Sequence, residues 1–142
     1  MEAHTSEFDA RAQEIADDVG AMIRGYGDFA DVIFSYAYGL TPVIDVTGLL
    51  PVFDCEHETE TAYDAVEAAL DAVKVAGPGY KITAQFHDSS GYAYWREEGD
   101  PLSIMIVAEI VDITKVDSSD LDDEIRAVSA KLYAIMAAHC AS

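Results

Sequence analysis

Positive charge is scarce in this sequence, and one long segment has none. Eight lysines and arginines stand against 27 acidic residues, giving a formal net charge of −19, and neither lysine nor arginine occurs between Arg24 and Lys74. Such a surface repels nucleic-acid phosphates and anionic membranes, and it attracts cationic ligands and basic proteins. The composition therefore disfavours direct nucleic-acid binding and favours a basic protein as the partner.

Long hydrophobic runs and cysteines are scarce as well. Apolar runs such as residues 104–108 are far shorter than the ~20 residues that span a bilayer. The N-terminus has neither the basic leader nor the apolar segment of a signal peptide. Cys55 and Cys140 allow at most one disulfide, so no disulfide scaffold is expected. We therefore expect a cytoplasmic protein with no membrane segment.

The negative charge can also arise without a partner, in two ways. It can serve solubility alone, or it can be an adaptation to high salt. The sequence keeps eleven isoleucines and has four lysines and four arginines. We expect a salt-adapted surface to have fewer large aliphatic residues and to prefer arginine, so this composition speaks against salt adaptation. Solubility, salt adaptation and recognition of a cationic partner remain the three explanations of the charge.

Hydrophobic periodicity predicts three amphipathic helices. Apolar residues recur at helical spacing over residues 6–24, 61–75 and 118–139. Gly25 follows the first segment, and Gly77-Pro78-Gly79 is predicted to end the second. Four acidic residues in the first turns of the third segment complement the positive end of the helix dipole.

Alternating residues between these helices predict strands. Residues 31–38 alternate clearly, with Tyr38 on the apolar side, whereas 43–46 and 50–55 are shorter and interrupted by proline and glycine. Segments 80–87, 91–97 and 102–113 predict a three-strand antiparallel meander. With 51% hydrophobic residues in 142, the chain is expected to form one α+β domain, residues 1–142. Its sheet is mostly antiparallel, with the meander in the C-terminal half and about three packed helices.

The predicted meander has a core face and an opposite face. A first turn centred on residues 89–90 places Gln85 opposite Tyr94. Glu109 then lies on the same face, where we expect it at the sheet edge or paired with a group such as Arg96. The core face has these members: Tyr80, Ile82, Ala84, Phe86, Ala93, Trp95, Ile104 and Ile106. The opposite face is a candidate ligand face: Gln85, His87, Tyr92, Tyr94 and Glu109.

The candidate ligand face has three interpretations. Tyrosines suit binding sites, and a histidine beside a carboxylate can transfer protons. A half-buried sheet face with cross-strand aromatic pairs accounts for the same residues without a ligand. The four tyrosines of residues 36–38 and 92–94 can also leave an apolar patch, so homodimer formation is a further expectation, although the charge opposes it.

Acidic residues continue from an extended run onto the second predicted helix. On that helix they repeat at helical spacing, without a lysine to relieve their repulsion. A solvated acidic face accounts for the pattern, and so does a surface that docks on a basic partner. The expected partner-binding residues are Asp54, Glu56, Glu58, Glu60, Asp64, Glu67 and Asp71.

Motifs for catalysis, cofactors and metals are lacking. Cys55 and His57 are two residues apart, but no second cysteine or histidine pair stands at zinc spacing. There is no G-x-S-x-G elbow and no glycine-rich phosphate loop. We therefore expect a small non-catalytic interaction protein without cofactor, in the manner of an inhibitor, immunity protein or nucleic-acid mimic. The alternative is a small-molecule-binding domain or small enzyme that uses the candidate ligand face.

Overall fold

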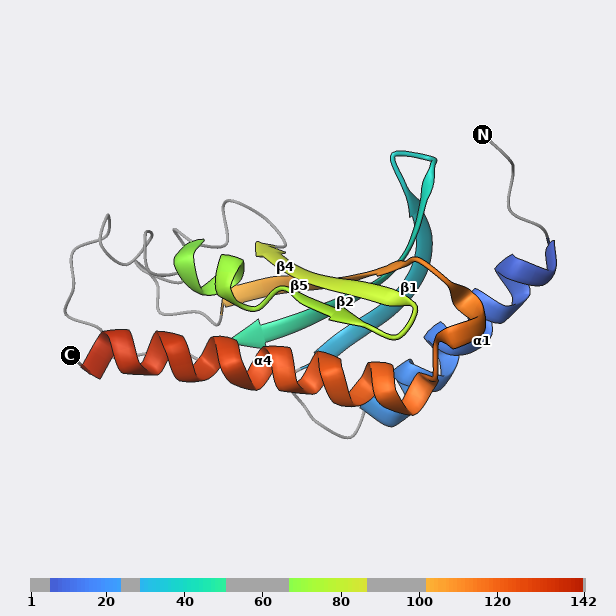
Figure 1. Cartoon of the computed structure of the whole chain (residues 1–142). Helices are drawn as coiled ribbons and strands as arrows, with labels where there is room; N and C mark the ends of the chain where they lie inside the picture. Colours follow the sequence, from blue (N-terminus) through green and yellow to red (C-terminus); the bar gives the residue numbers. More distant parts are fainter. Residues whose placement is uncertain (1–5, 24–28, 51–66, 87–101, 142) are drawn as a thin grey trace.

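The fold is an antiparallel sheet with helices on one face (Figure 1). The computed structural model describes residues 6–23, 29–50, 67–86 and 102–141. It confirms the predicted α+β class. The elements follow in this order: α1 (Ser6–Ile23), β1 (Phe29–Ala37), β2 (Thr41–Leu50), a helical segment at 67–72, β3 (Val75–Gly77), β4 (Tyr80–Phe86), β5 (Leu102–Ile110), the 3-10 turn η2 (Ile113–Lys115) and α4 (Ser118–Ala141).

The five described strands have the order β1-β2-β5-β4-β3, and every neighbouring pair is antiparallel. Strand β5 therefore lies in the middle, between two hairpins that are separate in the sequence. Because side chains alternate across a sheet, each strand gives one set of residues to the helices and another to the opposite face. We call this second face the open face, since no helix of the described residues covers it.

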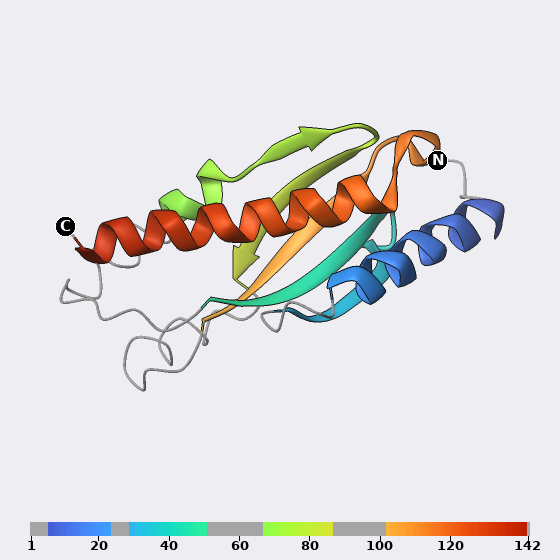
Figure 2. The same ribbon diagram turned by 90° about the horizontal axis from the view of Figure 1, so that it is seen from below.

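The hydrophobic core lies between the sheet and the helices, which cross one face of it (Figure 2). Ile15 of α1 and Ile125 of α4 are fully buried there. The predicted core face of β4 and β5 is confirmed, because Tyr80, Ile82 and Ile106 are all buried against the helices. Alternation in the sequence thus assigned these two strands to the correct side.

Helices α1 and α4 lie side by side near the start of α4 (Figure 2). An Arg11 guanidinium nitrogen donates a hydrogen bond to the Val116 carbonyl at 3.4 Å. The Ser118 hydroxyl lies 3.2 Å from a carboxylate oxygen of Asp18. These contacts hold the beginning of the C-terminal helix against the N-terminal helix, and they bring together acidic residues that are far apart in the sequence.

The C-terminal half does contain a three-strand antiparallel meander, but its members differ from the prediction. Strands β4 and β5 pair directly, with Gln85 opposite Met105, so no strand separates them. The third member is β3, which joins β4 through a turn at Pro78-Gly79. Gly79 has φ +83°, and its carbonyl accepts hydrogen bonds from the backbone N–H groups of residues 111 and 112. Segment 91–97, predicted as the middle strand, lies outside the described residues.

Two further boundaries differ from the prediction. Strand β2 is continuous over ten residues, although Pro42 and Gly48 were expected to interrupt it. Pro42 is tolerated because it pairs with β1 alone, before the first residue pair with β5, and so no N–H group is needed there. Tyr38 lies in the β1–β2 turn with φ 54° and is fully exposed, instead of continuing the apolar side of β1.

Candidate functional site

Most of the predicted partner-binding residues fall outside the described part of the chain. Asp54, Glu56, Glu58, Glu60 and Asp64 belong to this group, and their role stays a prediction. The helix predicted over 61–75 is helical at 67–72 within the described residues.

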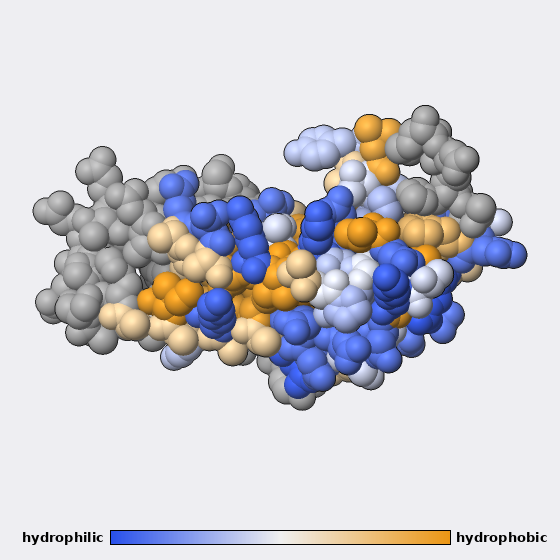
Figure 3. Space-filling view, viewed as in Figure 1, coloured by the Kyte–Doolittle hydropathy of each residue, from blue (hydrophilic) through white to orange (hydrophobic). Residues whose placement is uncertain are grey.

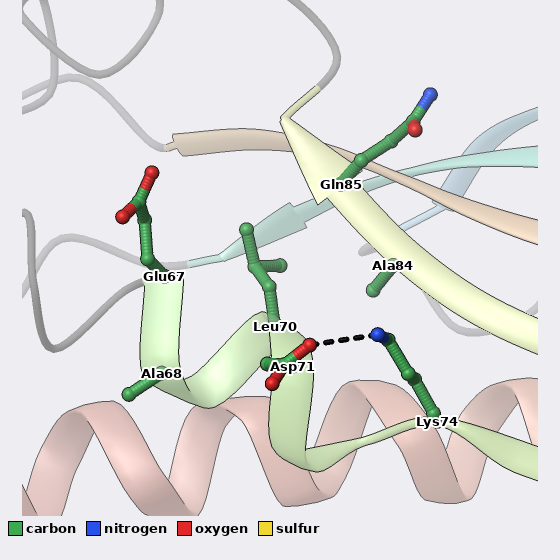
Figure 4. Close-up of a pocket in the computed structure, with 7 residues that line it drawn as sticks. All are labelled: Glu67, Ala68, Leu70, Asp71, Lys74, Ala84 and Gln85. Carbon is green, nitrogen blue, oxygen red and sulfur yellow. Dashed lines mark ion pairs between the residues drawn. The ribbon is translucent and has the colours of Figure 1, made fainter.

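The remaining two predicted partner-binding residues, Glu67 and Asp71, are exposed on this helical segment (Figure 4). They border a recess of about 630 Å³ that reaches Gln85 at the end of β4. Asp71 forms an ion pair with Lys74 at 2.7 Å, and the hydrogen bond from Lys74 lowers the pKa of this carboxyl. The expectation that no lysine relieves the acidic run is therefore wrong at Asp71.

A denser group of carboxylates lies where α1 meets the start of α4. Hydrophilic side chains gather over this end of the molecule in Figure 3. Asp117 caps α4, because its carboxylate accepts a hydrogen bond from the Ser119 backbone N–H at 2.7 Å. We call the group the acidic junction, and its members are all exposed: Glu14, Asp17, Asp18, Asp117, Asp120 and Asp123.

Few cations offset the acidic junction. Arg11 pairs with Glu14 at 3.0 Å, and Arg126 pairs with Asp123 at 2.6 Å. Arg126 also lies 2.8 Å from Asp122, a carboxylate that is only 3% exposed. Within the described residues, Asp17 and Asp120 have no ion pair with lysine or arginine. The junction therefore keeps a large excess of negative charge.

The sequence did not predict this site. The acidic residues at the start of α4 were attributed to the helix dipole, and those of α1 were not singled out. Local periodicity could not show that residues 14–18 and 117–123 come together, because about a hundred residues separate them. The one available signal was the repeated excess of acid at both ends of the chain.

The candidate ligand face is described only in part. Gln85 and Glu109 lie on the open face, while His87, Tyr92 and Tyr94 lie outside the described residues. Glu109 was expected at the sheet edge, but it is in a strand that is paired on both sides, with Lys81 and Val43 as its neighbours in register. The predicted pairing of Gln85 with Tyr94 stays a prediction, because Tyr94 lies outside the described residues; within them Gln85 is opposite Met105 of β5.

The open face contains a hollow of about 320 Å³ beside the β1–β2 turn. Its lining includes a carboxylate, Asp45, at the middle of β2. Partial burial raises the pKa of Asp45 above its usual value, although the Ser35 hydroxyl, 3.5 Å away, acts in the opposite direction. Further residues that line the hollow are Val43, Gln85, Met105 and Val107.

Residues 6–23, 29–50, 67–86 and 102–141 contain neither a metal-binding cluster nor a helix that could span a membrane. In these ranges no group of three or more histidine, cysteine, aspartate or glutamate side chains is placed to hold a metal ion. Cys55 and His57 lie outside them. Neither α1 nor α4 is long and apolar enough to cross a membrane.

Comparison with known proteins assigns no family to this arrangement. No protein-family model matches the sequence, and no curated protein or solved structure is significantly similar to it. Inferences about function therefore rest on the geometry and charge of the chain itself.

Proposed function

We propose that this chain is a small non-catalytic interaction protein that docks on a basic protein of the nucleic-acid-binding type. It acts there as an inhibitor, an immunity protein or a nucleic-acid mimic. The observation that carries the proposal is the acidic junction, in which two helices place six exposed carboxylates on one side of the molecule. Carboxylates so gathered oppose the lysines and arginines with which such a partner holds phosphates.

The distribution of charge on the described surface supports recognition over a uniform coating. The open face carries three carboxylates on its β1, β2 and β5 strands, Asp31, Asp45 and Glu109, and it is otherwise largely apolar or neutral. The acidic junction has six carboxylates, twice as many as the open face, and they lie within two neighbouring helix segments. A coating that serves only solubility has no reason to favour one side.

Binding of a partner should depend on both salt and the junction. We would immobilise the protein, capture binding proteins from a lysate of the source cells, and then purify the main captured protein. Its affinity is measured at 0.05 and 0.5 M NaCl, where the Debye length falls to about 4 Å. A nucleic-acid oligonucleotide bound to that partner should be displaced by this protein in a fluorescence-polarisation assay.

A charge-matched pair of variants makes the test specific. One variant neutralises Glu14, Asp17, Asp120 and Asp123 to their amides, and the second variant neutralises four acids elsewhere. The junction variant should bind at least tenfold more weakly, while the second keeps most of the affinity. Equal losses in the two variants, or binding that 0.5 M salt leaves unchanged, would contradict the proposal. A chain that folds only in molar salt would identify salt adaptation as the origin of the charge.

A further inference from the structure

The open face is curved, and the curvature forms the hollow. The β1–β2 hairpin rises away from the remaining strands (Figure 1), and the molecule is indented at the foot of this hairpin (Figure 3). Residues from four strands line the hollow, β1, β2, β5 and β4. Its volume of about 320 Å³ is at the lower end of the range of small-molecule sites.

Asp45 lies on the floor of this hollow. In register it pairs with Ile33 of β1 and Val107 of β5, so apolar side chains flank the carboxylate on both sides. The Ser35 hydroxyl, 3.5 Å from Oδ2, is its nearest polar neighbour among the described hydrogen bonds. No lysine or arginine of the described ranges forms an ion pair with it. A partly buried carboxylate in this setting lacks a counter-charge.

The surrounding charges leave the field at Asp45 negative. Asp31 lies further along the same face of β1, and Glu109 lies on β5. Lys81 of β4 is the basic residue of this face in the described strands, and it is directly opposite Glu109. Lys81 is thus closer in register to Glu109 than to Asp45, and Glu109 itself is opposite Val43, two residues from Asp45 along β2. The hollow combines one carboxylate with walls that include Val43, Met105 and Val107.

We propose that the hollow binds an organic cation, namely a primary amine with a compact apolar body. The ammonium group donates hydrogen bonds to the Asp45 carboxylate and the Ser35 hydroxyl, and the apolar body packs on Val43, Met105 and Val107. A metal ion fits less well, because calcium and magnesium require several oxygen ligands in one place. The site lies on the opposite side of the sheet from the acidic junction, so it is independent of partner docking.

Three probes of the same shape test the proposal: 2-phenylethylamine, 2-phenylethanol and phenylacetate. Each is titrated into the isotopically labelled full-length chain at 0.15 M NaCl, and backbone amide shifts are followed by NMR. The amine should shift the amides of Ser35, Asp45 and Val107 in a saturable way. The alcohol should bind at least tenfold more weakly, and the phenylacetate anion should not bind.

Two substitutions with the same change of charge separate recognition from general attraction. Asp45→Asn should weaken amine binding at least tenfold, whereas Asp31→Asn on the same face should change it less than twofold. Their NMR spectra also show whether each variant remains folded.

Three outcomes would overturn the inference. The first is equal weakening in the Asp45→Asn and Asp31→Asn variants, which indicates diffuse attraction by the net charge. The second is equal binding of the alcohol and the amine, which indicates an apolar site with no preference for a cation. The third is self-association through this face. In that case the amide shifts of the face change with protein concentration, and the amine fails to bind to the associated form, which identifies a second copy of the chain as the occupant.

Discussion

The hydroxyl group of Tyr36 on β1 donates a hydrogen bond to the Asp9 carboxylate of α1. This bond joins the N-terminal helix to the edge strand of the sheet. The ring of Tyr36 also meets Phe34 edge-on, with 5.3 Å between the ring centroids. Burial, the hydrogen bond and the charge of Asp9 together raise the pKa of Tyr36 to about 12.

Removing the Tyr36 hydroxyl should therefore reduce stability in a way that depends on pH. Tyr36→Phe is expected to cost about 1 kcal/mol at neutral pH, because one hydrogen bond is lost. The unfolded tyrosine ionises near pH 10 and the folded one near 12, so the folded state holds more protons between these values. This contribution to stability is complete below pH 10 and is lost as the pH rises toward 12.

Urea unfolding at pH 8, 10 and 11 measures the Tyr36 effect. The difference between the native protein and the phenylalanine variant should shrink as the pH rises. A constant difference would show that the hydroxyl does not contact Asp9 in solution.

Gly77 leaves room for the buried ring of Tyr80, its neighbour across the β3–β4 turn. A Cβ atom at Gly77 would stand 2.3 Å from the tyrosine Cζ atom, and Tyr80 is only 2% exposed. Gly77→Ala should therefore lower the free energy of unfolding by about 2 kcal/mol through overpacking. Chemical denaturation provides the measurement.

Gly20→Ala is the matched control, because the same methyl group is added where it meets no clash. At Gly20 of α1 the new Cβ would lie 3.6 Å from the Val32 Cβ of β1, which is an ordinary contact. Replacing a glycine inside a helix should stabilise the protein by about 0.5–1 kcal/mol. If both alanine variants shift the unfolding midpoint in the same direction, the Tyr80 ring does not lie as close to Gly77 as described.

Asp122 depends on Arg126 for its neutralisation. The Asp122 side chain is 5% exposed, and a guanidinium nitrogen lies 2.8 Å from Oδ2, whereas the buried Oδ1 accepts no hydrogen bond. Arg126→Met keeps the apolar stem and removes the charge, so it leaves a buried carboxylate alone. The expected cost is about 3 kcal/mol of unfolding free energy.

A second substitution identifies the source of that cost. In the double variant Arg126→Met with Asp122→Leu, most of the lost stability should return, since no charge remains buried. Lys115→Met removes a cation from an exposed pair and should leave the unfolding midpoint nearly unchanged. A double variant less stable than Arg126→Met would show that Asp122 contributes through further contacts.

Asp45 should reduce the stability of the free protein at neutral pH. Its pKa is raised above the ordinary value of 3.8, chiefly by burial, so the folded state holds the proton more tightly than the unfolded state. Stability therefore falls as the pH rises from 3.8 through the raised pKa. Asp45→Asn should raise the melting temperature at pH 7, and this gain should diminish as the pH approaches 4. A gain that is the same at pH 7 and pH 4.5 would contradict the assignment.

The sequence predicted the elements that have strong local periodicity. Helix α4 begins at Ser118, as its acidic first turns indicated, and α1 is helical from Ser6 through Ile23, the last described residue before β1. Alternation also assigned Ile82 and Ile106 to the core side. These features depend on side-chain spacing within a single element, which is visible in the sequence.

The pairing of strands could not be predicted in the same way. Alternation gives the face on which a side chain lies, but it does not name the neighbouring strand, so β5 was not expected beside β4. Gly77-Pro78-Gly79 is compatible with both a helix end and a hairpin turn, and only pairing of Val75 with Ile82 decides between them. The acidic junction likewise depends on a contact between helices, which no local pattern records.

The contact of α1 with α4 has a consequence for synthesis of the chain. Arg11 and Val116 are in contact although they are 105 positions apart in the sequence. Helix α4 therefore completes the helical layer on the sheet that α1 begins. A nascent polypeptide on the ribosome exposes the apolar side of its strands until residues 118–141 have emerged. During that interval, binding by chaperones competes with aggregation, and the core cannot close before α4 is available to pack on it.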